Sequence, residues 1–289
     1  MDGFHIVAPG FSPGNRDDMM KSYVLITGAA GGLGKAFAAE CAARGWDLFL
    51  TDTVESSLAI LAEGLLRLHN VDVQYSACNL TDPAARGSLW ETIGGRNLQI
   101  HALINVAGVD FEGPFAERSL GELNTIIRLN IESVVAMTRT VLQYRDKTRT
   151  LRIINVSSLA GFYAMPVKAV YAASKRFLLD FSRALHRELR TDNITVTALC
   201  PAGMPSNPAV IGSIDAQGFM GRMTTKNVGF VASRTITHAL AGRPVYIPGA
   251  INLVLRLLGG MVPPSIVTAF IGKRWIKARR NHVPAAGSK

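Results

Sequence analysis

A tyrosine and a lysine four residues apart, Tyr171 and Lys175 in "YAASK", form the pair with the clearest chemistry in this sequence. Residues at this spacing share one face of a helix, so the ammonium can lie near the phenol. A free phenol has a pKa near ~10 and is a poor base at neutral pH, but a nearby positive charge stabilises its phenolate. The pair could exchange a proton with a substrate. The alternative is a half-buried aromatic residue with a solvated lysine beside it.

A glycine-rich turn, "TGAAGGLG", follows the first apolar run of the chain and contains Gly28, Gly32, Leu33 and Gly34. Glycines at this place let the backbone turn tightly and approach a diphosphate, which then lies at the positive end of the following helix. A tight turn without a ligand would need the same residues. The position directly after a strand favours the nucleotide-binding interpretation.

The second apolar run ends in "FLTDT", which places Asp52 about twenty residues beyond the glycine turn, where a carboxylate can bind ribose hydroxyls. The same charge would repel a 2′-phosphate, and no Arg or Lys stands within the turn or directly after Asp52. We therefore expect NAD in preference to NADP. Aspartate is also a common cap of helices and turns, which is the alternative interpretation.

These residues need elements that bring them together, and the sequence alternates short apolar runs with longer helical patterns. We predict strands over 22–27, 47–51, 71–76, 100–105, 151–157, 194–200 and 244–248. Helices are predicted over 33–45, 55–68, 82–93, 126–144, 170–189 and 228–241. This alternation is typical of an α/β protein with a Rossmann-type, doubly wound, parallel seven-stranded sheet and helices on both faces.

From about Ser22 to Pro248 the chain resembles the short-chain dehydrogenase/reductase family. Its motifs stand in the family's order: "TGAAGGLG" for TGxxxGxG, "CNLTD", "INVAG" for NxAG, "RLNIESV", "NVSS" and "YAASK" for YxxxK. The resemblance implies that Tyr171 exchanges a proton with the substrate oxygen while a hydride passes between the substrate carbon and the nicotinamide. It also implies that Ser158 positions that oxygen, and that Asn130 holds a water linking Lys175 to solvent.

The resemblance also implies a cofactor site, with no metal ion. Asn79 stands where the family usually has Asp, and "PAGMPS" departs from the usual PGxVxT because Ala202 replaces a glycine and Ser206 a threonine. A serine hydroxyl can still hold the nicotinamide amide. The implied cofactor-binding residues are Gly28, Gly32, Leu33, Gly34, Asp52, Asn79, Leu80, Asn105, Ala107, Gly108, Tyr171, Lys175, Pro201, Gly203, Met204 and Ser206.

The substrate is expected to be a small apolar alcohol or ketone, such as a steroid, a fatty-acyl chain or another lipid, because apolar residues surround the expected pocket. They are Phe111, Phe115, Phe162, Met165 and, in the following loop, Met204, Ile211, Ile214, Phe219, Met220 and Met223. The alternative is that most of them belong to the core.

Charge is unevenly distributed along the chain. The net charge is +10, and after Asp215 there are eleven Lys and Arg but no Asp or Glu. Such asymmetry indicates contact with an anionic partner, such as a phospholipid surface or an acidic protein, or else a solvated basic tail. Nucleic acid is not expected, because no recognised binding module surrounds the basic cluster.

We expect three segments: a poorly ordered extension over 1–20, an NAD-binding catalytic domain over 21–250, and an apolar, then basic, C-terminal cap or tail over 251–289. The run 251–272 is interrupted by Arg256, Gly259-Gly260 and Pro263-Pro264, which predicts two short helices and no single membrane span. These helices could lie on a membrane surface. A lid over an apolar pocket or a dimer contact is favoured over that role.

A cytoplasmic enzyme is expected, with a possible peripheral contact at the inner membrane surface. The first residues lack both a basic start and a sustained apolar run, and the three cysteines read as buried apolar residues in a reducing compartment. The resemblance implies a homodimer or homotetramer formed through the helices around 126–144 and 170–189. The competing hypothesis is a protein that binds NAD as a sensor or scaffold without turnover, although its catalytic set is complete.

Overall fold

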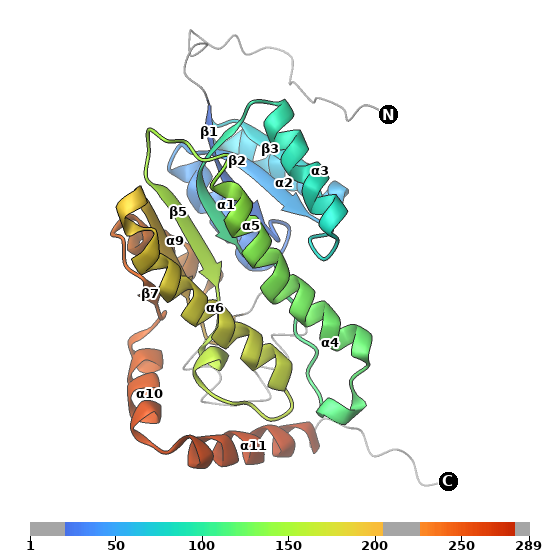
Figure 1. The fold of residues 1–289 in the computed structure, drawn as a ribbon, viewed down its shortest axis with the longest axis vertical. Coiled ribbons are helices and arrows are strands. Elements are labelled where there is room, and N and C mark those ends of the chain that lie inside the picture. Colours follow the sequence, from blue (N-terminus) through green and yellow to red (C-terminus); the bar gives the residue numbers. More distant parts are fainter. Residues whose placement is uncertain (1–20, 205–225, 281–289) are drawn as a thin grey trace.

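The computed structural model describes residues 21–204 and 226–280, and its centre is a single parallel sheet (Figure 1). The strand order is β3-β2-β1-β4-β5-β6-β7, so β1 pairs with both β2 and β4 and the direction of winding reverses between β1 and β4. In such sheets, ligands bind outside the carboxyl ends of the strands at this reversal. The strands are β1 (Ser22–Thr27), β2 (Asp47–Asp52), β3 (Val73–Ala77), β4 (Gln99–Asn105), β5 (Leu151–Val156), β6 (Ile194–Leu199) and β7 (Val245–Tyr246). The predicted fold is confirmed.

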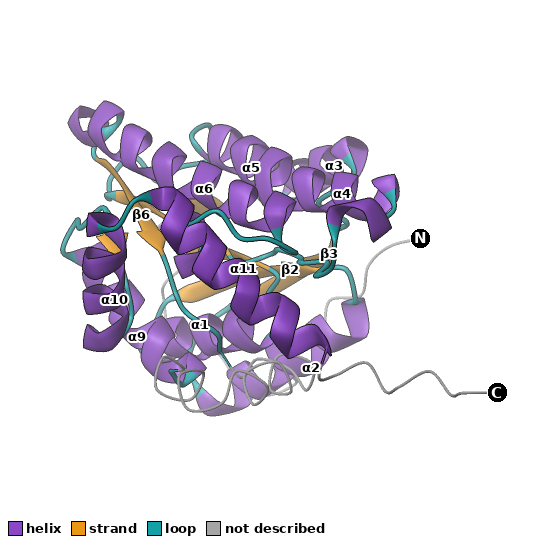
Figure 2. Ribbon diagram, turned by 90° about the horizontal axis from the view of Figure 1, so that it is seen from below, coloured by secondary structure: helices purple, strands orange, loops and turns teal. Residues whose placement is uncertain are grey.

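Helices cover both faces of the sheet (Figure 2). One layer contains α1 (Gly32–Ala43), α2 (Glu55–Leu68) and α9 (Val228–Leu240). The other contains α3 (Pro83–Gly95), α4 (Leu120–Ile127), α5 (Ser133–Val141) and α6 (Ala169–Glu188). Strands covered on both faces must be apolar throughout, which is why β1, β2, β4 and β5 are nearly continuous runs of buried residues.

Two large hydrophobic clusters fill the spaces between the sheet and the helix layers. Phe37 and Leu58 lie in the cluster under α1 and α2, and Phe49 and Met137 lie in the cluster on the opposite face. The three cysteines, Cys41, Cys78 and Cys200, are free and buried, as expected of small apolar residues.

The predicted helix over 126–144 was wrong in its bounds. Helix α4 begins at Leu120, because Ser119 and Glu122 form a capping box: Glu122 N donates to Ser119 Oγ (3.2 Å), and Ser119 N donates to a Glu122 carboxylate oxygen (2.9 Å). A π-helical turn at Arg128–Glu132 joins α4 to α5, which ends at Val141. The extra residue in such a turn rotates the helix face that follows it.

Two helices follow the last strand, α10 (Ala250–Met261) and α11 (Pro264–Arg280), which confirms the prediction of two helices in this region. The break falls at Val262, which has extended backbone as expected so close to a proline pair. Figures 1 and 2 show α11 lying across the carboxyl ends of the strands. Among the described residues, no helix is both long enough and apolar enough to cross a membrane.

Substituting two helical glycines should have opposite effects on stability. A Cβ at Gly34 in α1 would overlap the carbonyl oxygen of Gly28, whereas a Cβ at Gly64 in α2 would meet no atom within 4 Å. We expect Gly34→Ala to lower the free energy of unfolding by about 1–3 kcal/mol through overpacking. Gly64→Ala should raise it by about 0.5–1 kcal/mol. Urea denaturation of both variants measures this, and equal effects would contradict the packing described.

Candidate active site

The first turns of α6 hold the tyrosine–lysine pair on one face. Lys175 Nζ lies 5.6 Å from the centre of the Tyr171 ring and donates a hydrogen bond of 2.9 Å to the carbonyl oxygen of Val156, the last residue of β5. The lysine is only 5% exposed. The strand end therefore fixes the ammonium beside the phenol, as the spacing of the pair predicted.

Burial sets the protonation behaviour of this lysine. Removal from water lowers the pKa of Lys175 to about 8, and the negative charge of Asp110 opposes this shift. A lysine with such a pKa can release and regain a proton near neutral pH, which a solvated lysine cannot do. This property fits a role in proton exchange better than the alternative of a solvated neighbour.

Ser158 lies directly beyond β5 and faces the tyrosine. Its hydroxyl is close enough to the Tyr171 hydroxyl to lower the pKa of that phenol, accepts a bond of 3.1 Å from Ala160 N, and lies 3.5 Å from the carbonyl oxygen of Pro201. The turn that follows, η3 (Leu159–Phe162), packs on α6 and fixes the serine's backbone. The two hydroxyls can therefore meet at one substrate oxygen.

The pKa of Tyr171 departs from the expectation drawn from the pair alone. Burial and the charge of Asp110 raise it, while the hydrogen bond from Ser158 and the charge of Lys168 lower it by less, so that the net direction is upward. Lys168, whose Nζ lies 5.7 Å from the ring centre, is thus the lysine whose charge favours the phenolate here. Because its pKa is raised, the phenol of Tyr171 is held protonated, as a proton donor requires.

The π-helical turn directs Asn130 inward, where it is fully buried. Its Oδ1 accepts a hydrogen bond from Val109 N, and its Nδ2 donates to Val109 O, both at 2.9 Å, with a further bond of 3.1 Å to Ser174 Oγ. A Cβ at Gly108 would lie 3.1 Å from Asn130 Oδ1 and 3.2 Å from Lys175 Nζ. The Asn130 side chain thus holds the end of β4 against the catalytic helix, and the predicted water on this residue stays a prediction.

The glycine turn has the geometry of a phosphate cradle. Gly28 has a φ of +64°, and a Cβ there would come within 2.8 Å of the Ala107 backbone, so only glycine fits. The N-cap of α1 is Gly31, which has no side chain to occupy the first N–H groups of the helix, and the first turn contains no acidic residue. The N-terminus of α1 is therefore suited to a diphosphate.

Asp52 lies beside this turn at the end of β2. One carboxylate oxygen accepts a bond of 2.9 Å from Ala30 N in the turn, and the other accepts a bond of 2.7 Å from Thr53 N. The structure thereby brings the carboxylate to the predicted place, with lone pairs left for ribose hydroxyls.

The other predicted cofactor residues fall into two groups. Asn79 is exposed beyond β3, Ala107 lies against Gly28, and Gly203 is exposed beyond β6, so that all three border the carboxyl edge of the sheet. The side chains of Leu80 and Met204 instead pack on the hydrophobic clusters, and only their backbone can face a cofactor. Ser206 lies outside the described residues.

Asn105 supports the sheet. Its Nδ2 donates to Asn155 Oδ1 (2.8 Å), and Asn155 Nδ2 donates to Ser182 Oγ (3.0 Å), which links β4, β5 and α6. Pro201 is buried, and its carbonyl accepts a bond of 2.9 Å from Leu159 N. Asn105 and Pro201 therefore hold the backbone segments around the site in place.

The cradle, the carboxylate and the catalytic pair together fit a nicotinamide dinucleotide. The backbone at Gly28 leaves no room for a side chain, the first turn of α1 presents N–H groups, and Asp52 stands at the far side of the turn. The diphosphate would be held by the glycine turn, the adenosine ribose by Asp52 and the nicotinamide ribose by Lys175.

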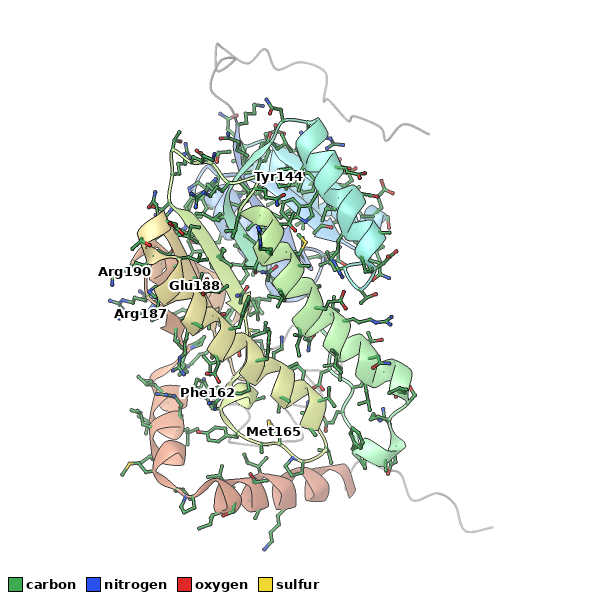
Figure 3. All side chains as sticks on the ribbon, in the orientation of Figure 1. Tyr144, Phe162, Met165, Arg187, Glu188 and Arg190 are labelled. Atoms are coloured by element: carbon green, nitrogen blue, oxygen red, sulfur yellow. The ribbon has the colours of Figure 1, made fainter. Side chains whose placement is uncertain are left out.

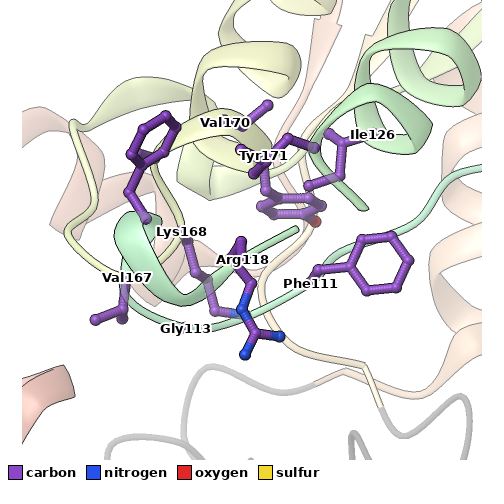
Figure 4. A pocket seen from close by; sticks show the side chains of 11 residues that line it. Phe111, Gly113, Arg118, Ile126, Val167, Lys168, Val170 and Tyr171 are labelled. Carbon is purple, nitrogen blue, oxygen red and sulfur yellow. The ribbon is translucent and has the colours of Figure 1, made fainter. Parts of the chain in front are cut away.

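A pocket opens beside the tyrosine and has largely apolar walls (Figure 4). It is lined by Phe111, Gly113, Phe115, Arg118, Leu123, Ile126, Val167, Lys168, Ala169, Val170 and Tyr171. Phe111 and Phe115 confirm the sequence prediction. Phe162 instead packs with Leu179 and Cys200 in a third, smaller cluster. Figure 3 shows Phe162 and Met165 on the loop before α6.

Sequence reasoning missed the charged cluster beside this pocket. Lys168 Nζ lies 2.5 Å from Asp110 Oδ2 and 2.9 Å from Glu112 Oε2. Burial disfavours the ammonium, but the two carboxylates outweigh it and hold the pKa of Lys168 above its usual value. Lys168 is the N-cap of α6 and has non-helical backbone, so helical spacing alone would not have placed its ammonium beside Tyr171.

The same loop contains backbone strain. Val167, a β-branched residue, has a φ of +61°, and its carbonyl accepts a bond of 2.8 Å from Gly113 N. Such residues rarely adopt this conformation, and it persists where surrounding contacts enforce it. Together with the ion pairs of Lys168, this bond clamps the loop after β4 to the loop before α6 at the mouth of the site.

The fold and site define a dinucleotide-dependent oxidoreductase of the tyrosine–lysine type. The sequence matches the family model described as short chain dehydrogenase over residues 22–210, and the chain belongs to this family.

Known proteins of similar sequence and structure agree with this assignment. The 3-oxoacyl-[acyl-carrier-protein] reductase FabG of Escherichia coli (strain K12) is 28% identical over 241 residues, which are 80% of this chain and 97% of that protein. The 17-beta-hydroxysteroid dehydrogenase type 3 of Rattus norvegicus is 32% identical over 192 residues, 65% of this chain and 62% of that protein. A short-chain dehydrogenase from Sphingobium yanoikuyae, solved in complex with NADPH, superposes with a TM-score of 0.71 at 25% identity, covering 93% of this chain and 98% of that one.

The two charges that act on the pKa of Tyr171, those of Asp110 and Lys168, should shift the pH dependence of catalysis in opposite directions. The negative Asp110 disfavours the phenolate, so Asp110→Asn should lower the pKa of Tyr171; the positive Lys168 favours it, so Lys168→Gln should raise that pKa. Lys175 and Arg118, the other charged groups near the phenol, are unchanged in both variants.

The measurement is the pH profile of kcat/KM for alcohol oxidation. Its rising limb should move to lower pH in Asp110→Asn and to higher pH in Lys168→Gln, with Glu91→Gln, at an exposed position of α3, as the control. Shifts of both variants in one direction would contradict the assignment.

Proposed function

We propose that this protein interconverts a secondary alcohol and a ketone on an apolar substrate, with NAD as the preferred cofactor and Tyr171 as the acid/base. The observation that carries the proposal is the buried lysine fixed 5.6 Å from the centre of the tyrosine ring, with Ser158 close enough to act on the pKa of the same tyrosine. A sensor without turnover would not need this arrangement.

In the direction of reduction, the Tyr171 hydroxyl donates its proton to the carbonyl oxygen of the substrate. Ser158 donates a hydrogen bond to the same oxygen and fixes its position. A reduced nicotinamide, when bound, would supply the hydride for the carbonyl carbon, so that one hydride and one proton complete the alcohol. In oxidation the phenolate takes the hydroxyl proton, and Lys175 stabilises that phenolate and passes the proton on.

Acid–base chemistry and the orientation of the reactants both contribute to the proposed rate enhancement. Proton transfer by a positioned group is typically worth about 10²- to 10⁴-fold in rate. Holding the reactants in line contributes further, because the binding step has already restricted their motion. The bond that Lys175 Nζ donates to Val156 O and the bond that Val109 N donates to Asn130 Oδ1 serve this purpose, since they fix the backbone segments around the reacting groups.

Apolar pocket walls support a lipid-like substrate. Phe111, Phe115, Leu123 and Ile126 surround the entrance to the tyrosine. The names of two relatives, a 3-oxoacyl reductase and a hydroxysteroid dehydrogenase, point to the same chemistry, reduction or oxidation at an oxygen on a largely apolar skeleton. We therefore propose an acyl chain or a steroid-like compound as the substrate class.

Replacing Tyr171 by Phe should abolish the acid/base without disturbing the fold. We expect turnover to fall by about 10²- to 10⁴-fold, while NAD binding, measured by fluorescence titration, stays near that of the wild type. Tyr144→Phe is the control, because Tyr144 stacks on Trp90 at 5.0 Å between ring centres, away from the site. Normal turnover in Tyr171→Phe would overturn the proposal.

Preference for NAD rests on the charge of Asp52. Asp52→Asn keeps the size of the side chain but removes the charge that repels a 2′-phosphate. We expect the ratio of kcat/KM with NADP to that with NAD to rise by about 10-fold or more, since a hydrogen bond to a charged group is worth about 1.5–3 kcal/mol. Asp180→Asn, on the exposed side of α6, should leave the ratio unchanged. An unchanged ratio in Asp52→Asn would show that another residue selects the cofactor.

Assembly into a homodimer or homotetramer in the cytoplasm also stays a proposal. Its support is that Ile127 on α4, Val135 on α5 and Phe177 on α6 are exposed apolar residues on the helices expected to form the interface. Phe177 also stacks on Phe181 at 5.6 Å, which adds a flat aromatic surface to α6.

A further inference from the structure

Helix α10 has its apolar face turned away from the protein. Leu253, Val254, Leu257, Leu258 and Met261 recur at the spacing of one helix face and are all exposed, Leu257 at 53%, Leu258 at 55% and Met261 at 82%. In a helix that packs only on its own core, this face would be the buried one. The exposed face formed by these five residues is called the outer face below.

The opposite side of α10, which contacts the protein, is polar. Asn252 is 1% exposed and its Nδ2 donates a bond of 2.7 Å to Pro248 O. The Tyr163 hydroxyl donates a bond of 3.2 Å to Leu255 O, and the Arg256 guanidinium lies 4.9 Å from the centre of the Phe162 ring. The helix is therefore fixed in this orientation by specific contacts, which keep the outer face exposed.

The exposed apolar surface continues onto α11. Ile266 and Phe270 are 58% and 67% exposed, and Val262 at the corner between the helices is also exposed. About half of the exposed large apolar side chains in the described part of the chain lie between Ile251 and Phe270. Contiguous exposure of this kind marks a surface that meets a partner or a membrane.

Charge decides between the possible occupants. No acidic residue occurs after Asp215, and α11 ends in the basic run "KRWIKARR", whose first residue, Lys273, is exposed. A second copy docked through the same face would bring two basic surfaces together, since a two-fold interface pairs each patch with itself. An anionic lipid surface offers the opposite charge and an apolar layer below it.

Both helices also contact the loop that leads from Ser158 to Tyr171. Helix α10 binds it through Tyr163 and Phe162. Helix α11 meets it at Gly272, where a Cβ would lie 3.0 Å from Pro166 Cγ. The exposed helix pair thus contacts the loop that contributes Val167 and Lys168 to the lining of the pocket beside Tyr171.

We propose that the outer face of α10, continued by Ile266 and Phe270 of α11, is a docking surface for an anionic phospholipid membrane. The apolar side chains enter the boundary between head groups and acyl chains, and the basic residues bind the head groups. Docking would set the mouth of the pocket beside the bilayer, where an apolar substrate is concentrated; this last step rests on the proposed function, but the docking itself does not.

The test is flotation of the full chain with vesicles of phosphatidylcholine, alone or mixed with phosphatidylglycerol. We expect binding to the mixed vesicles, weaker binding to phosphatidylcholine alone, and a loss of binding as salt is raised. Leu257→Gln/Met261→Gln should weaken binding about 10-fold or more, because burying each such side chain is worth about 1.5–3 kcal/mol. Ile60→Gln/Leu68→Gln, at exposed positions of α2, is the matched control.

Equal binding of the two double variants, or no binding of the wild type to mixed vesicles, would overturn the proposal. So would sedimentation equilibrium showing that Leu257→Gln/Met261→Gln dissociates an oligomer that the control retains, because the face would then be an interface between copies. Turnover of a water-soluble alcohol should be unchanged in both double variants. Loss of flotation with turnover retained would therefore separate membrane docking from the chemistry.

Discussion

The bond from Lys175 Nζ to the carbonyl of Val156 is the interaction on which the site depends. It holds the lysine at the end of β5, where burial lowers the pKa of the ammonium, and it aligns the first turns of α6 with the edge of the sheet. Ser158 leaves the same strand two residues later, so one strand end positions both partners of Tyr171. The order of the sheet then places the glycine turn of β1 within reach, because β1 and β5 both pair with β4.

A second consequence of this arrangement is electrostatic. The site balances three charges around one phenol, with Asp110 raising its pKa, Lys168 lowering it and Lys175 placed beneath the ring. The clamp between Lys168 and the two carboxylates also fixes the loop whose strained Val167 lines the pocket. Lys168 thus both lines the pocket and lowers the pKa of Tyr171, the proposed proton donor, and α10 and α11 contact the loop that precedes it.

Local sequence signals predicted much of the fold and part of the candidate site. Adjacent residues encode the apolar runs, the glycine turn and the Tyr171–Lys175 spacing. The observed sheet, its helices and the approach of Ser158 to Tyr171 agree with the structure that these patterns predict. Contacts between distant residues could not be predicted from the sequence. Asp110 and Lys168 stand 58 residues apart, and no local pattern indicates that they form an ion pair. The start of α4 was missed although its capping box is local, and the inverted orientation of α10 follows from tertiary contacts of Tyr163 and Arg256 that no periodicity contains.

The most direct test of the central claim is the transfer of deuterium from a secondary alcohol labelled at its carbinol carbon. The wild-type protein is incubated with NAD and a panel of labelled steroid, fatty and small alcohols, and the reduced cofactor is analysed by mass spectrometry. The account predicts one deuterium in the reduced nicotinamide for each ketone formed, with the label absent when Tyr171 is replaced by Phe. Tight NAD binding without deuterium transfer from any alcohol in the panel would contradict it.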